Sequence, residues 1–245
     1  MLRHIVTIAV LASAGSAAAQ DDIHMGAFND AGSIISDIAG NAAVGKSIEN
    51  ELRRRQDEAP KVVAASRAPS DIGQLLSFRR DPRITEQVRA AIASDIRRGN
   101  PEAAEHFLKV SRRFDIQDAL AREGLTPGSL VDVATYMVGV YWAAAHGTTR
   151  VPTGKPLRAL RKQMAAALLR DQPERLRGVS DERKQRYADE MLIRAQMMAS
   201  ILADYARTPN PAEQAQIAKG AREQVRKTIG LDLLQYRLTE EGLVR

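Results

Sequence analysis

The segment from Leu130 to Ala145 constrains the fold of this chain more than any other part of its sequence. Apolar residues occupy nearly every position, so a helix formed here would be hydrophobic on all its faces. A membrane-spanning helix needs about 20 apolar residues, which is more than this segment offers. A short helix of this kind is normally the buried centre of a bundle. We therefore predict a central apolar helix over about residues 129–145, surrounded by other helices.

Start and stop signals for further helices recur from Asp81 onward. Asp81-Pro82, Asn100-Pro101, Ser180 and Asn210-Pro211 combine a capping side chain or a proline with a following run of spaced apolar residues. Good helix formers are abundant, whereas the alternating Val, Ile, Thr and Tyr runs typical of strands are missing. The sequence predicts an all-α fold over residues 81–245, a single bundle of about five to seven helices. A short apolar tail, from Leu231 to Val244, is expected to pack back onto it.

The first nineteen residues read as a secretory signal peptide. Arg3 supplies the positive charge, Ile5 to Ala12 form a short apolar core, and Ser16 to Ala19 form a small-residue cleavage tract. We expect cleavage after Ala19, with an uncleaved N-terminal anchor as the alternative. Residues 20–80 are rich in Gly, Ser and Asn and are predicted to be a flexible extension or linker, with one helix at about 44–58.

The chain contains no cysteine, which excludes both disulfides and a lipid-modified N-terminal cysteine. We therefore expect a periplasmic or secreted bacterial protein that is not a lipoprotein and has no integral membrane segment once the leader is removed. Its partner would be a protein or another component of the cell envelope.

The formal net charge of +6 comes with basic runs scattered along the chain. These are Arg53-Arg54-Arg55, Arg79-Arg80, Arg97-Arg98 and Arg112-Arg113. Nucleic-acid binding would need them on one face with interleaved aromatic residues, and export makes that partner unexpected. Anionic envelope headgroups are the better candidates, and the alternative is a solvated helical surface with a modest positive bias.

A series of landmarks resembles an uncharacterised exported bacterial family of all-helical domains, over about residues 84–243. The landmarks are Gly124-Leu125, Asp132-Val133-Ala134, Trp142, Pro156 to Arg161, Lys184 to Glu190, Gly230-Leu231-Asp232, Leu238-Thr239 and Gly242-Leu243. This chain departs from the family where a tryptophan-rich stretch is typical, because it has Tyr136, Tyr141 and the single Trp142. The resemblance implies a helical fold and supplies no catalytic residue.

The candidate binding residues all lie on or beside the central helix. Asp132 with Tyr136, one turn away, could form a ligand contact or a general base, but Ser129-x-x-Asp132 also matches a helix-capping arrangement. Trp142 and His146 lie near the other end of the helix, where a histidine favours the negative end of the helix dipole. Farther along, Asp189-Glu190 with Arg186 and Arg194 is interpreted as a solvated ladder of ion pairs.

The sequence offers no nucleophile motif, no phosphate-binding loop and no set of metal ligands at a standard spacing, so we assign no catalytic residue, metal or cofactor. The favoured interpretation is a non-enzymatic envelope interaction or scaffolding module. Two alternatives stay open: a binder of anionic envelope surfaces through arginine clusters, and an enzyme that acts on an envelope polymer with a carboxylate in a helical cleft.

Overall fold

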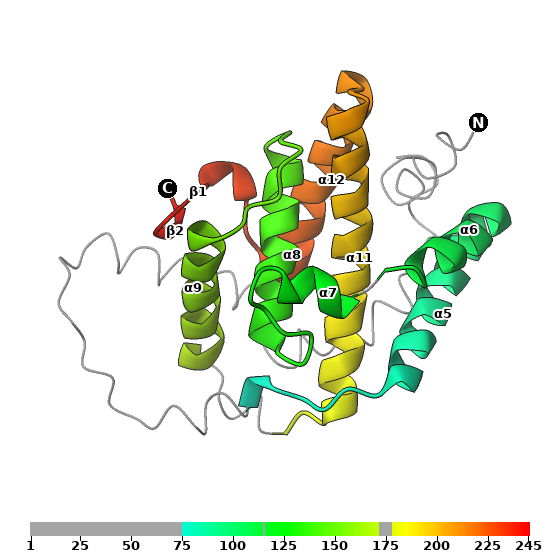
Figure 1. The fold of residues 1–245 in the computed structure, drawn as a ribbon, viewed down its shortest axis with the longest axis horizontal. Coiled ribbons are helices and arrows are strands. Elements are labelled where there is room, and N and C mark those ends of the chain that lie inside the picture. The colour runs from blue at the N-terminus through cyan, green and yellow to red at the C-terminus, as the bar shows by residue number, and fades with distance from the viewer. Residues whose placement is uncertain (1–74, 115, 172–177) are drawn as a thin grey trace.

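The computed structural model describes residues 75–114, 116–171 and 178–245 of the chain (Figure 1). The expected leader (1–19) and the expected helix at about 44–58 lie outside the described residues, as does most of the expected extension.

Within these ranges the chain forms seven α-helices followed by a short 3-10 turn and a two-stranded hairpin, which confirms the all-α prediction. In chain order the elements are α5 (Pro82–Gly99), α6 (Pro101–Ser111), α7 (Ile116–Ala121), α8 (Leu130–Ala145), α9 (Lys155–Asp171), α11 (Asp181–Arg207), α12 (Pro211–Ile229), η1 (Leu233–Gln235), β1 (Arg237–Thr239) and β2 (Gly242–Val244).

Most helices begin where the sequence predicts, because a polar side chain accepts a hydrogen bond from a backbone N–H group of the first turn. These side chains belong to Asp81, Asn100, Ser129, Ser180 and Asn210, which cap α5, α6, α8, α11 and α12. Proline lies in the first turn of α5, α6 and α12, where its missing N–H group is not needed.

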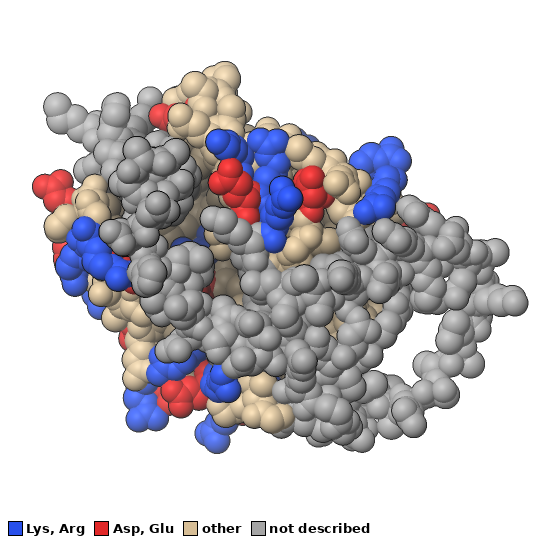
Figure 2. Space-filling view, turned by 180° about the vertical axis from the view of Figure 1, so that it is seen from behind, with Lys and Arg blue, Asp and Glu red and all other residues tan. Residues whose placement is uncertain are grey.

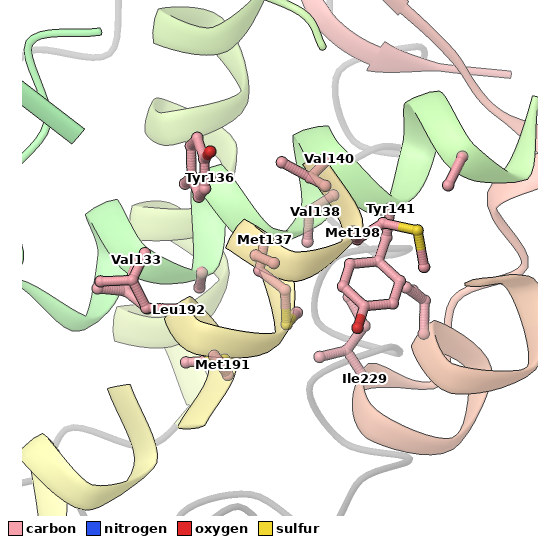
Figure 3. Close-up of a cluster of buried hydrophobic side chains, with 14 of the residues drawn as sticks. Val133, Tyr136, Met137, Val138, Val140, Tyr141, Met191, Leu192, Met198 and Ile229 are labelled. Atoms are coloured by element: carbon pink, nitrogen blue, oxygen red, sulfur yellow. The ribbon is translucent and has the colours of Figure 1, made fainter. Parts of the chain in front are cut away.

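Helix α8 is the centre of the molecule, as its sequence predicts. It packs against α9 on one side and against α11 and α12 on the other, and nearly all its residues are buried (Figure 1). Figure 3 shows side chains of α8, Met137 and Tyr141 among them, beside Met191 and Met198 of α11 and Ile229 of α12. Like the other helices that the structure describes, α8 does not combine the length and apolar character that crossing a membrane requires.

The segment just before α5 belongs to the packed part of the chain. Leu76 and Phe78 are buried in the core, and the backbone N–H of Phe78 donates to the carbonyl oxygen of Gly128 at 3.0 Å. The expected boundary at residue 80 therefore falls inside a segment that packs with the bundle. This packing fixes Arg79, Arg80 and Asp81 in an extended path that leads into α5 and passes beside α11.

The C-terminal residues pack back onto the bundle as expected, but part of them forms a hairpin. Strands β1 and β2 pair antiparallel, with Leu238 opposite Leu243, and they lie against α9. The side chain of Gln163 on α9 mimics a third strand: its amide oxygen accepts from the N–H of Leu243 at 2.8 Å, and its amide nitrogen donates to the Leu243 carbonyl at 3.1 Å.

Candidate functional site

A pocket of about 570 Å³ lies between the extended segment before α5, the first turns of α5 and the turn from α6 to α7. This volume is within the range of roughly 300–1,000 Å³ that is usual for small-ligand sites. Figure 1 places α5 and α6 at one side of the bundle, next to α11. The lining residues are Arg80, Pro82, Thr85, Glu86, Arg89, Arg112, Arg113, Phe114 and Gln117. Because four of them are arginines, we take this arginine pocket as the candidate functional site.

Arg80 is held in the pocket wall by a buried carboxylate on α11. Its Nη2 lies 2.6 Å from Oδ1 of Asp189, whose side chain is 0% exposed, and 3.1 Å from Oγ1 of Thr85. The hydroxyl of Thr85 in turn donates to Oδ2 of Asp189 at 2.6 Å. A buried carboxylate needs such partners, since an unpaired charge in the interior is strongly unfavourable. The ion pair with Asp189 of α11 therefore holds the guanidinium group of Arg80 in one position.

Gln185 extends this network to the backbone that enters α5. Its amide nitrogen donates to the carbonyl oxygen of Asp81 at 2.7 Å, and its amide oxygen accepts from the backbone N–H of Asp81 at 2.7 Å. The same amide nitrogen lies 3.0 Å from Oδ2 of Asp189. Lys184 donates to the carbonyl oxygen of Ser77 at 3.3 Å. These bonds fasten the extended segment to α11 and keep the pocket wall in place.

The opposite wall is arranged around Glu86. One of its oxygens forms an ion pair with Arg89, one turn farther along α5, and the other lies 3.4 Å from Nε of Arg112 at the end of α6. Arg113 and Phe114 continue this wall into the α6–α7 turn. Arg112 is well exposed, whereas only 11% of the Arg89 side chain is exposed.

Two guanidinium nitrogens of the pocket arginines are buried without a hydrogen-bond acceptor among the described residues. They are Nη1 of Arg80 and Nε of Arg89. A buried donor with no acceptor costs about 1–3 kcal/mol, and more when it is charged. Both nitrogens belong to residues that line the pocket. The arrangement is thus suited chemically to binding an anion.

The structure separates the four candidate residues of α8 into two places away from this pocket. Asp132 is 1% exposed and accepts from the backbone N–H of Thr126 at 3.0 Å, from its hydroxyl at 3.2 Å, and from Nε of Arg161. Ser129 caps the N–H of Asp132, as the capping interpretation expects. The carboxylate itself, however, reaches back to the loop before the helix and across to α9.

Tyr136 points into the core, where burial raises the pKa of its hydroxyl to about 12. At neutral pH this group stays protonated, so it is unavailable as a base. At the other end of α8, Trp142 donates to the carbonyl oxygen of Tyr236 at 2.9 Å, and Nε2 of His146 lies 3.1 Å from the carbonyl oxygen of Leu233. The Trp142 and His146 rings are 4.5 Å apart. Both side chains therefore contact the backbone of the C-terminal segment.

Sequence reasoning named Arg80, Arg112 and Arg113 among the basic runs, but it did not predict that they line one pocket or that Asp189 and Gln185 support it. Asp189 is fully buried and pairs with Arg80, so its interpretation as part of a solvated ladder is corrected. Glu190 lies 3.1 Å from Arg194, but only 15% of its side chain is exposed, and Arg186 bonds to Glu182 instead, so the expected solvated ladder does not form around Glu190. A signal was present in the sequence: Gln185 and Asp189 lie four residues apart on the face of α11 that continues to Ile193, which is buried. Polar residues on a buried face require polar partners.

Within residues 75–114, 116–171 and 178–245, no three His, Cys, Asp or Glu side chains gather as metal ligands would.

Comparison with known proteins places the chain in a family. No curated protein and no solved structure matches it. Residues 3–245 match the "Family of unknown function (DUF6683)", which confirms the expected resemblance to an uncharacterised domain family. Because the match covers nearly the whole chain, the protein belongs to this family of unknown function.

Proposed function

We propose that this protein is an exported, non-enzymatic interaction module that binds anionic groups of the bacterial cell envelope through the arginine pocket. The observation that carries the proposal is that a guanidinium nitrogen of Arg80 and one of Arg89 are buried with no acceptor among the described residues, in a pocket lined by four arginines. The leader-like segment from Met1 to Ala19 supports export to the envelope. Two of the basic runs in the sequence, Arg79-Arg80 and Arg112-Arg113, each contribute to this pocket.

We favour binding over catalysis because the acidic group that lines the pocket is already engaged in ion pairs. Among the lining residues the only carboxylate is Glu86, which is engaged by Arg89 and Arg112. A general acid or base needs a titratable group free to exchange a proton with the substrate. An enzyme acting through a carboxylate in a cleft therefore gains no support from this site.

The described side chains that Figure 2 shows do not gather into a broad basic face. On the face shown in Figure 2, basic and acidic side chains stand next to one another in small groups. Elsewhere on the described surface, Arg97 pairs with Glu105 and Arg98 pairs with Asp95. Where opposite charges are neighbours, their combined attraction for a distant anion is small, and salt screens what remains beyond the Debye length of about 8 Å at physiological ionic strength. In the arginine pocket, four arginines line the same cavity as a single carboxylate, Glu86.

The test is sedimentation of the purified protein with phosphatidylglycerol vesicles and with neutral phosphatidylcholine vesicles. We expect binding to the anionic vesicles only, with loss of binding as salt is raised. The double variant Arg112→Gln/Arg113→Gln should bind weakly. The matched control, Arg97→Gln/Arg98→Gln, removes the same charge from the far end of α5 and should bind almost as well as the unmodified protein. Equal losses in the two variants would show that net charge, not the pocket, drives binding.

Export is tested separately by intact-mass analysis of the protein recovered from the periplasm. The mass should correspond to a chain that begins at Gln20. A chain that retains Met1 would contradict cleavage of the leader.

A further inference from the structure

We propose that the arginine pocket is a discrete site for a phosphate monoester, with Arg80 and Arg89 as its principal ligands. This inference rests on the proposed function and goes further, because it names the chemical class of the bound group. The first support is that Arg80 Nη1 and Arg89 Nε are buried, lie in residues that line the pocket, and have no acceptor among the described residues. Diffuse attraction to a charged surface uses exposed side chains and would not require buried donors.

The charge in and behind the pocket matches a dianion. Four arginines line it, Glu86 lies among them, and Asp189 is in contact with Arg80 from behind. Four positive and two negative groups leave two positive charges. A phosphate monoester carries a charge of about −1.5 to −2 at neutral pH, whereas a carboxylate or a phosphodiester carries one negative charge.

The arrangement of donors suits a tetrahedral group. Arg80 comes from the extended segment before α5, Arg89 from the middle of α5, and Arg113 from the turn after α6. Donors on three separate elements can approach different oxygens of a phosphate. A planar carboxylate is matched instead by one guanidinium fork that binds both its oxygens in a single plane.

The pocket also has room for the organic part of an ester. A phosphate group alone is much smaller than the pocket volume of about 570 Å³. Pro82 and Phe114 add apolar surface to the lining. An aliphatic or sugar moiety attached to the phosphate would cover this surface, which favours a phosphate ester over inorganic phosphate.

The experiment is isothermal titration of the purified protein with glycerol 3-phosphate, inorganic phosphate and acetate. We expect saturable binding of one glycerol 3-phosphate per chain, weaker binding of phosphate, and no measurable binding of acetate. Arg89→Lys keeps the charge but removes the Nε donor and should weaken binding by about tenfold or more. Arg97→Lys, the same change eight residues farther along α5, is the matched control and should leave binding unchanged.

Folding is monitored by thermal melting of each variant. Arg113→Gln serves as a second test, because this exposed side chain can be changed with little effect on folding; it should also weaken glycerol 3-phosphate binding. Unchanged affinity in both Arg89→Lys and Arg113→Gln would overturn the inference.

The two proposals fail in different ways. If glycerol 3-phosphate does not bind but sedimentation with phosphatidylglycerol vesicles still depends on Arg112 and Arg113, the monoester site is wrong and the surface role stands. If glycerol 3-phosphate binds but no anionic vesicle does, the site stands and the surface role is wrong. Vesicles of phosphatidic acid, a monoester lipid, identify the source of the phosphate group. If the protein sediments with these vesicles and glycerol 3-phosphate releases it, the ligand is a lipid headgroup. If glycerol 3-phosphate binds but the protein does not sediment with these vesicles, the ligand is a soluble ester.

Discussion

Asp132 shows how a single buried carboxylate joins three parts of the chain. It lies in the first turn of α8, accepts two hydrogen bonds from Thr126 in the preceding loop, and pairs with Arg161 of α9. From sequence, a cap at this position would be worth about 1 kcal/mol. The observed contacts add the bonds to Thr126 and the ion pair, so its removal should cost more.

We expect Asp132→Ala to lower the free energy of unfolding by about 2 kcal/mol, because the N–H of Thr126 loses its acceptor. Arg161→Gln should cost less, because the Asp132 carboxylate keeps both hydrogen bonds from Thr126 and the Arg161 side chain is itself 49% exposed. Urea denaturation of both variants measures the difference. Equal losses would mean that the ion pair, rather than the bonds to the loop, is the main contribution.

Met137 provides the corresponding test of the core. It is 5% exposed on the central helix and lies among side chains of α8 and α11 (Figure 3). Met137→Ala should leave a cavity and cost roughly 2–5 kcal/mol. Met137→Asp should cost more, because it would bury an unpaired charge. Thermal melting is the measurement, and a Met137→Asp protein that melts like the unmodified one would refute the central position of α8.

At the scale of elements, the C-terminal hairpin depends on one close approach between a glycine and a side chain. Gly242 has a φ of 99°, and a Cβ atom added there would lie 2.3 Å from Oε1 of Gln163. That oxygen is the acceptor that holds the N–H of Leu243. Gly242→Ala would therefore both strain the backbone and displace the side chain that fastens the hairpin to α9.

Gly124→Ala is the matched control, because Gly124 also has a positive φ of 68° but nothing within 4 Å of the added Cβ. We expect Gly242→Ala to destabilise the protein by at least about 1 kcal/mol more than Gly124→Ala. Hydrogen exchange at the amide of Leu243 should accelerate only in the Gly242 variant. Exchange that stays slow there would mean that Gln163 is not what fastens the hairpin.

The helices could be predicted because their signals are local. A cap such as Asn210 and the proline after it determine a helix start within one turn, and the apolar run of α8 identifies a buried helix. The hairpin could not be predicted in this way, since strands of three residues are too short for an alternating pattern. Its tertiary contact with Gln163 comes from a residue about 80 positions earlier.

The pocket was missed for a related reason. Arg80 and Asp189 are 109 residues apart, and no local pattern connects them. Each arginine doublet was recognised in the sequence, but only the packing of α5 against α11 and α6 brings Arg80, Arg89 and Arg112 to one place. Ion pairs between distant elements depend on the tertiary fold, which periodicity and capping do not specify.

At the scale of the whole molecule, the buried tyrosines predict how stability responds to alkali. Burial raises the pKa of Tyr136 to about 12 and also raises the pKa values of Tyr141 and Tyr187 above the ordinary value of 10. Between pH 10 and 12 the unfolded chain therefore releases protons that the folded chain retains. The stabilising contribution of these tyrosines is fully present below pH 10 and is lost as pH rises through the folded-state values.

We expect the free energy of unfolding to fall steeply above pH 10, by up to about 1.4 kcal/mol per pH unit for each such tyrosine. Tyr136→Phe removes one of these groups while keeping the aromatic ring, so its stability should decline less steeply than that of the unmodified protein. Lysine deprotonation affects both proteins equally and cancels in the comparison. Urea denaturation at several pH values between 8 and 12 gives the two slopes, and parallel curves would show that Tyr136 titrates alike in the folded and unfolded chains.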